Sequence, residues 1–339
     1  MPSGESDGIT WRRLAGLPAC GLVIALATLV GPGETRAQDP RALRAACILA
    51  LKDRLDAPIP ETSLDLCELA VAVNPPDPEL KSWLAAALAS SGRGAQAVET
   101  FRAAAEGGDV EAMKALGLIH LRRQTEAATA EAAFAWLRRA GEGGDSEAQN
   151  MVGTMYLNGI GVAGDPQEAA RWFQRAATSG NPDAQSNLAF MHLNGIGRPR
   201  DPEAAVSLFR AAARRGSPIA QSALGALYLQ GQGVGRDPQE AARWFRRSAE
   251  QGWPQGQNNL GTLYLQGLGV EHDPAEAEQW IRRAAEAGHP HAQANLGQLY
   301  EKGLAVPQSK DDALTWYRRA AEQGHPGAAE ALQRLEGGS

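Results

Sequence analysis

The chain has 339 residues and a formal net charge of −6, with 21% charged and 43% hydrophobic residues. This composition is typical of a folded protein, and its mild acidity gives no basic face of the kind that binds nucleic acid. The length ordinarily corresponds to two or three domains, but an array of repeats grows without a single central core.

The N-terminal segment predicts a secretory signal peptide. Arg12 and Arg13 precede a mostly apolar run over 14–30, and small residues lead to a predicted cleavage point after Ala37. Two alternatives are a lipoprotein acylation box ending at Cys20 and a twin-arginine signal. Cleavage predicts a periplasmic or secreted protein with no membrane span after signal removal.

Two cysteines follow the predicted cleavage point. Cys47 and Cys67 lie on predicted helices over about 40–54 and 62–73. In an oxidising compartment an even pair predicts a disulfide, which would stabilise the helical hairpin by about 3 kcal/mol. The alternative interpretation is two buried free thiols.

A period of 36 residues dominates the rest of the sequence. It separates aromatic or large apolar residues at Trp172, Leu208, Trp244, Trp280 and Trp316. It also separates glycines at Gly180, Gly216, Gly252, Gly288 and Gly324. A fixed period of this size, with spacing and identity recurring together, predicts a solenoid.

Each unit predicts two helices joined by a glycine turn. In one unit the first helix runs over about 147–158 and ends at Gly159. Asp165 and Pro166 open the second helix, because aspartate caps free backbone N–H groups and proline has no N–H to lose.

Small residues predict close packing of the two helices. Gly225 and its equivalents let the helices approach, and large residues such as Tyr156 and Trp172 fill the space between units. Replacing Gly225 by valine is therefore predicted to cost several kcal/mol through overpacking. A recurring glutamine is predicted to tie the joints to neighbouring backbone, at Gln149, Gln185, Gln221, Gln257 and Gln293.

The stretch from Ala220-Gln221 through Gly252 resembles the Sel-one-like repeat (SLR), a longer-loop relative of the tetratricopeptide repeat. The last unit departs from this pattern at Ala305 and Ser309. The resemblance implies an all-α fold, a right-handed α/α superhelical solenoid whose first helices line a concave groove. It also implies an adaptor, because exported bacterial members take part in envelope signalling, polysaccharide regulation or host contact.

The predicted organisation has about six 36-residue SLR units preceded by a tetratricopeptide-like unit. The predicted segments are a signal peptide (1–37), a helical hairpin with the disulfide (38–75), a tetratricopeptide-like repeat (76–109), six SLR units within 110–325 (110–145, 146–181, 182–217, 218–253, 254–289 and 290–325) and a C-terminal capping helix and tail (326–339).

No catalytic, cofactor or metal site is predicted. The sequence lacks the common zinc-protease, nucleophile-elbow and phosphate-loop motifs. His289 and His325 occupy the repeat position of Asn181, which favours a capping role over a metal site, while His192 replaces a tyrosine and is predicted to pack between helices. The alternative function is an envelope enzyme or enzyme subunit of the β-lactam or cell-wall hydrolase kind.

Paired arginines recur on the second helices, for example at Arg246 and Arg247. They are interpreted either as a solvated outer face or as a surface for an anionic partner such as an acidic glycan or a membrane leaflet.

The leading hypothesis is a non-catalytic scaffold or regulator of the bacterial cell envelope that binds a protein or peptide partner in the groove. Amide side chains can bond an extended peptide backbone without requiring charge, and the alternative is that these groups are only solvated. The predicted partner-binding residues are the non-core positions of the first helices, namely Asn150, Thr154, Asn158, Ser186, Phe190, Asn194, Ser222, Gln230, Asn258, Thr262, Gln266, Gln298 and Lys302.

Overall fold

The structure is a computed structural model that describes residues 39–52, 59–74, 77–122 and 127–337. The predicted signal peptide and Cys20 lie outside these residues. Within the described ranges the regular structure is α-helical, with no strands. The helices are α2 (Pro40–Leu51), α3 (Glu61–Val73), α4 (Pro78–Ser90), α5 (Gly94–Glu106), α6 (Val110–Arg122), α7 (Ala127–Glu142), α8 (Ser146–Asn158), α9 (Pro166–Thr178), α10 (Pro182–Asn194), α11 (Pro202–Arg214), α12 (Pro218–Gln230), α13 (Pro238–Glu250), α14 (Pro254–Gln266), α15 (Pro274–Glu286), α16 (Pro290–Lys302), α17 (Lys310–Glu322) and α18 (Pro326–Gly337).

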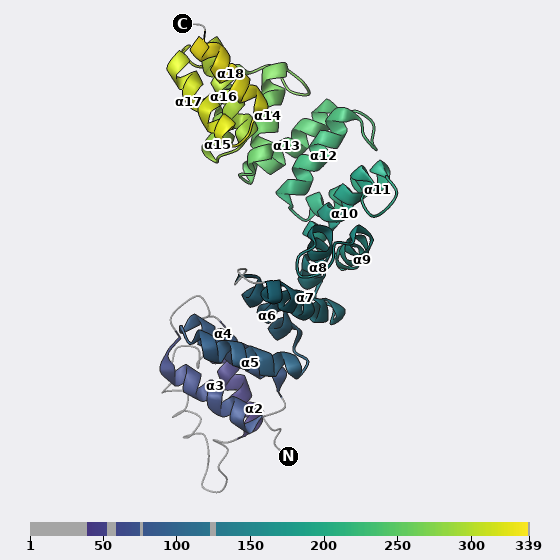
Figure 1. The fold of residues 1–339 in the computed structure, drawn as a ribbon, viewed down its shortest axis with the longest axis vertical. Coiled ribbons are helices and arrows are strands. Elements are labelled where there is room, and N and C mark those ends of the chain that lie inside the picture. The colour runs from purple at the N-terminus through teal and green to yellow at the C-terminus, as the bar shows by residue number, and fades with distance from the viewer. Residues whose placement is uncertain (1–38, 53–58, 75–76, 123–126, 338–339) are drawn as a thin grey trace, which may run out of the picture. The chain divides into compact units, whose positions relative to one another are not determined.

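These helices form two compact units (Figure 1). Among the described residues, the first unit comprises those within 39–148 together with Ile160–Val162, and the second comprises Gln149–Gly159 together with 163–337. In each unit consecutive helices pack in pairs, as α4 does with α5 and α12 with α13, and each pair contacts the next. This arrangement confirms the predicted all-α solenoid.

The first helical hairpin is closed by the predicted disulfide. Cys47 on α2 and Cys67 on α3 are bonded, with a sequence separation of 20 residues. Both cysteines are fully buried in one hydrophobic cluster, beside Leu64 and Leu80. The disulfide therefore links α2 and α3 within the N-terminal hydrophobic cluster.

A glycine on the first helix allows the two helices of most repeats to approach closely, and α10 has Ala189 at this position. A Cβ atom built on Gly225 would lie only 2.7 Å from the ring of Phe245, and one on Gly153 would lie equally close to Phe173. The predicted close approach is thus supported. The side chain that contacts the glycine belongs to the residue after the tryptophan position, within the same helix pair.

The tryptophans complete cores that extend across two repeats, as the sequence predicted. Trp280 packs against the cluster formed by Phe245 on α13 with Leu260 and Leu263 on α14. Each cluster therefore needs helices from successive repeats, and a single repeat cannot bury its own apolar face.

The loop between the two helices of a repeat is closed by backbone hydrogen bonds and a cap. In one repeat the N–H of Asp237 donates to the carbonyl oxygen of Tyr228 over 2.9 Å, and the Asp237 carboxylate accepts from the N–H of Glu240. Gly233 lies earlier in the same loop with φ 68°, and a Cβ atom there would lie 2.3 Å from the carbonyl oxygen of Pro202 in the preceding repeat. The second loop glycine thus brings the backbones of two repeats into contact.

Ala305 occupies the position of this second loop glycine in the last repeat and has φ 58°. A left-handed conformation is costly for alanine and easy for glycine. We expect Ala305→Gly to raise the free energy of unfolding by about 1 kcal/mol. Part of this gain is offset because glycine makes the unfolded chain more flexible. Urea denaturation followed by circular dichroism measures this change, and an unchanged or lower midpoint would contradict the expectation.

The recurring glutamine has the predicted structural role. The Gln221 side chain on α12 donates to the carbonyl oxygen of Ala213 on α11 over 3.2 Å. Gln185, Gln257 and Gln293 make the same bond to their preceding second helices. Since these side chains are buried, the bond satisfies a backbone carbonyl at the joint between repeats.

Candidate partner-binding surface

The first helices of the second unit present one solvent-facing side each. On α12 the buried positions include Gln221, Ser222 and Leu224, whereas Ile219 and Gln230 are exposed. We define the first-helix surface by the four outward columns of α10, α12, α14 and α16. These columns are Asp183, Ile219, Gln255 and His291; Asn187, Ala223, Asn259 and Asn295; Phe190, Ala226, Thr262 and Gln298; and Asn194, Gln230, Gln266 and Lys302.

The predicted partner-binding residues form three columns along the first helices, and one of these columns does not face solvent. Ser186, Ser222 and Asn258 are buried, which corrects their predicted exposure. The reason is that this column faces the neighbouring first helix, where the Asn258 Oδ1 atom accepts a hydrogen bond from Asn295 over 2.8 Å. Asn150, half-buried on α8, makes the same contact with Asn187 over 3.0 Å.

The other two predicted columns are open to solvent to different degrees. Phe190 is 43% exposed, although its ring also meets the buried Phe209 edge-on at a centroid distance of 5.2 Å. Thr154 and Thr262 are half-buried and donate to carbonyl oxygens one turn earlier in their own helices. The remaining members are exposed: Asn158, Asn194, Gln230, Gln266, Gln298 and Lys302. Their role in partner binding stays a prediction.

Sequence reasoning missed the column that contains Asn187, Asn259 and Asn295. These asparagines are half-buried and lie one residue after the buried column. Their recurrence at one position of the 36-residue repeat could have identified them as a column. It was overlooked because helical phase alone does not show how a helix is rotated against its neighbours.

The paired arginines are held by aromatic side chains of the array. The Arg246 guanidinium donates to the hydroxyl group of Tyr264 over 2.7 Å, and Arg247 lies 4.7 Å from the ring centroid of Trp244. Arg282 and Arg283 repeat both contacts with Tyr300 and Trp280. These contacts give the stripe a structural role, and Arg246, Arg247 and Arg283 stay exposed.

Two histidines act as helix caps. The Nδ1 atoms of His289 and His325 accept the backbone N–H groups of Ala292 and Ala328, respectively, each over 3.2 Å. Burial, and secondarily the nearby His291, lowers the pKa of both imidazoles below the ordinary 6.5. Both caps require a neutral imidazole, because a protonated Nδ1 cannot accept a hydrogen bond.

Stability is therefore expected to decrease as the pH falls below 6.5. In that range the unfolded chain binds protons at His289 and His325 that the folded chain resists, so the free energy of unfolding drops. We expect a loss of about 1–2 kcal/mol between pH 7.5 and pH 5. Denaturant midpoints measured across this range should show a smaller loss in the variant with His289→Asn and His325→Asn, and an identical loss would contradict the capping role.

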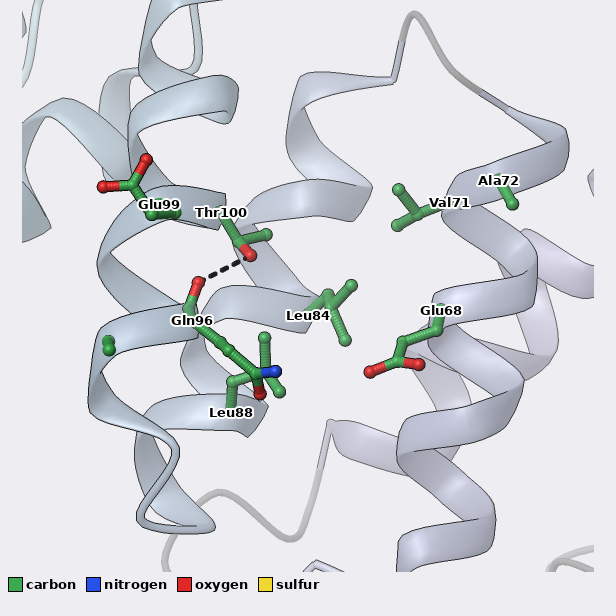
Figure 2. A pocket seen from close by; sticks show the side chains of 9 residues that line it. Glu68, Val71, Ala72, Leu84, Leu88, Gln96, Glu99 and Thr100 are labelled. Atoms are coloured by element: carbon green, nitrogen blue, oxygen red, sulfur yellow. Dashed lines mark hydrogen bonds between the residues drawn. The ribbon is translucent and has the colours of Figure 1, made fainter.

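A cavity of about 590 Å³ lies in the first unit between α3, α4 and α5 (Figure 2). Its floor is formed by Leu84 and Leu88, and Glu68 and Glu99 lie on opposite sides. Each carboxylate already has an arginine within 4.0 Å, Arg93 for Glu68 and Arg102 for Glu99. We assign no separate role to this cavity.

The described part of the chain contains no cluster of three or more histidine, cysteine, aspartate or glutamate residues placed to hold a metal ion. Among these same residues, none of the helices has the length and apolar character needed to cross a membrane.

The fold and the repeat define a tetratricopeptide-like helical solenoid. A model of the Sel1 repeat matches six consecutive segments, 110–145, 146–181, 182–217, 218–253, 254–289 and 290–325, and the chain belongs to this family.

Two solved structures are similar to the chain. One is a protective antigen of uropathogenic Escherichia coli with an SLR fold, at 28% identity and a TM-score of 0.73, covering 92% of this chain and 67% of that one. The other is a Sel1 repeat protein from Oxalobacter formigenes, at 32% identity and a TM-score of 0.59, covering 64% of this chain and 86% of that one. A comparison with curated proteins gives no match.

Proposed function

We propose that this Sel1 repeat protein is a non-catalytic scaffold that binds a polypeptide partner through its first-helix surface. The observation that carries the proposal is the repetition of outward-facing, mostly uncharged side chains along α10, α12, α14 and α16. The positions behind them are buried in a packed array, which holds the surface in place. Helical repeat arrays use such extended surfaces to bind other chains.

The non-catalytic assignment is supported by what the titratable groups do. His289 and His325 are used as caps, and the carboxylates of Asp237 and Asp273 cap helices through backbone N–H groups. The arginines bond or stack on aromatic rings.

We also propose that the scaffold works in the bacterial cell envelope, either in the periplasm or after secretion. The signal-like pattern of residues 1–37 and the Cys47–Cys67 disulfide support this location, because disulfides persist in oxidising compartments. The similarity to a protective antigen of Escherichia coli agrees with it. Cell fractionation and mass spectrometry of the N-terminus should place the protein outside the cytoplasm with Gln38 as its first residue. A cytoplasmic protein that retains Arg12 would contradict the proposal.

Affinity capture with two charge-matched variants tests the binding surface. One variant carries Gln230→Glu, Gln266→Glu and Gln298→Glu on the first-helix surface, and the other carries Gln174→Glu, Gln239→Glu and Gln279→Glu on exposed positions of second helices. Both add the same charge without changing side-chain size. We expect the first variant to lose a partner that the wild type and the second variant retain. Equal capture by both variants would contradict binding through the first-helix surface.

A further inference from the structure

The charges of the second unit are divided between two stretches of the sequence. Residues 166–250 hold eleven arginines and seven acidic residues, whereas residues 251–339 hold seven basic and eleven acidic residues. The basic stretch contains the second helices α9, α11 and α13. Since the whole chain has a formal net charge of −6, this stretch is a local excess of positive charge in an acidic protein.

Four arginines of this stretch lie at the ends of its second helices. Arg175, Arg214 and Arg247 are in the last turns of α9, α11 and α13, and Arg215 directly follows α11. All four are exposed. In the part of the chain that the structure describes, none of them has a carboxylate oxygen within 4.0 Å of its guanidinium group. We call these four residues the arginine face.

Two of the four guanidinium groups are held flat on tryptophan rings. Arg175 lies 4.8 Å from the ring centroid of Trp172, and Arg247 lies 4.7 Å from that of Trp244. Stacking uses the planar face of a guanidinium and leaves its N–H donors, which lie in that plane, available to an anion. The stacked side chains therefore lose little conformational entropy when they bind.

The repeat between these two lacks both members of the stacked pair. It has Leu208 and Ala211 at the two positions. Arg214 and Arg215 follow Ala211 by three and four residues, which places them on the same side of the helix. Arg215 also reaches the preceding repeat, because a Cβ atom on Gly180 would lie 2.6 Å from its Nη2 atom. Exposed guanidinium groups thus occur on all three successive second helices.

The tryptophans beneath the arginines limit the class of anion. Trp172 is 5% exposed and Trp244 is 7% exposed. These rings offer no open face on which a nucleobase could stack, and they offer no apolar anchor for insertion into a bilayer. The ligand must therefore be recognised through its charges and hydrogen-bonding groups. A carboxylate fits this requirement, because its two oxygens match the forked N–H groups of a guanidinium.

Neutral and acidic side chains beside the arginines favour a sparsely charged polymer. Ser179 and Gln251 lie four residues after the two stacked arginines, and both are exposed. Hydroxyl and amide groups bond to sugar hydroxyls without adding charge. Glu250, also exposed, lies three residues after Arg247 and repels a densely charged anion. These neighbours suit a polysaccharide with one carboxylate on each sugar.

We propose that the arginine face binds an anionic polysaccharide of the polyuronate class. The site lies on second helices and takes a different class of ligand from the first-helix surface. It therefore goes beyond the proposed scaffold function, and either proposal can fail while the other stands.

Titration of the full chain with a defined oligosaccharide tests the inference. The probe is a fluorescent oligogalacturonate, and binding is followed by fluorescence anisotropy. The matched ligand is the same oligomer with its carboxyl groups reduced to alcohols, which removes the charges and keeps the sugar backbone. Sedimentation with phosphatidylglycerol vesicles distinguishes a polysaccharide from an anionic lipid surface.

Two protein variants remove the same number of charges from the second unit. The test variant changes the arginine face, and the control changes second helices of the acidic stretch, where two of the three arginines also stack on tryptophans. The test variant carries Arg175→Gln, Arg215→Gln and Arg247→Gln, and the control carries Arg283→Gln, Arg318→Gln and Arg319→Gln. Because both lose two stacking contacts, circular dichroism should show similar unfolding midpoints.

We expect the test variant to bind the oligogalacturonate about 10-fold or more weakly than the wild type, since it loses three ion pairs at an exposed site. The control should stay within about 2-fold of the wild type, because charges beyond about 8 Å are largely screened at physiological ionic strength. The reduced oligomer should bind at least about 10-fold more weakly than its parent.

Three outcomes would overturn the inference. The first is no binding of the oligogalacturonate by the wild type at about 1 mM. The second is equal weakening in the test and control variants, or equal binding of the charged and reduced oligomers. The third is binding of the vesicles in preference to the oligogalacturonate, which would assign the arginine face to a lipid surface.

Discussion

Replacing Gly225 by valine is expected to lower the free energy of unfolding by about 3 kcal/mol. A Cβ atom on Gly225 would lie 2.7 Å from the Phe245 ring, a distance that real Cβ contacts essentially never show. Phe245 on α13 is almost fully buried in a cluster with residues of α12 and α14, so its ring cannot move away without opening the core. Denaturant unfolding followed by circular dichroism measures the change.

Gly235→Val provides the matched control. Gly235 lies in the loop of the same repeat, and a Cβ atom there would meet no other atom within 4 Å. We expect this variant to stay within about 0.5 kcal/mol of the wild type. If both variants unfold at the same denaturant concentration, the close approach of α12 to α13 is not a source of stability.

Removing the disulfide is expected to cost about 3 kcal/mol. The bond between Cys47 and Cys67 closes a loop with a sequence separation of 20 residues, which restricts the unfolded chain. The double variant Cys47→Ala and Cys67→Ala avoids placing a hydroxyl group in the cluster around Leu64. Its first unit should unfold at lower denaturant concentration and become sensitive to proteases within α2 and α3.

A reductant distinguishes the cross-link from packing effects. Dithiothreitol should destabilise the wild type by a similar amount and leave the double variant unchanged. If the reductant has no effect on the wild type, the cysteines contribute through packing, and the thiol alternative becomes the better description.

Local signals in the sequence predicted the elements of each repeat well. Asp237 before Pro238 marked the start of a second helix, and its carboxylate does accept the N–H of Glu240. Gly231 after α12 adopts φ 71° and ends the helix as predicted. These features depend on backbone conformation within a few residues, so the local sequence is enough to identify them.

The orientation of the first helices could not be predicted in the same way. Ser222 and Asn258 were expected to face solvent, but both are buried against a neighbouring repeat. Helical periodicity shows which positions share a side, while contacts between repeats decide which polar side is covered. One predicted column was therefore placed one residue too early along the helices, and the column that includes Asn259 was missed.

Pair contacts between distant residues were also missed. Arg246 bonds to Tyr264, which lies 18 residues later and in the next repeat. The sequence showed both residues as recurring columns, but only the packing of α13 against α14 shows that the two columns meet.

The joints between repeats have a consequence for chain length. Gly233 contacts Pro202 of the preceding repeat, and Gly269 contacts Pro238 in the same way. Because each joint uses the same kinds of atoms, a copy of 218–253 inserted after Trp253 would find matching neighbours on both sides. The number of repeats can then change without redesign of any joint, and the reach of the molecule along a bound partner would grow in whole steps of one helix pair.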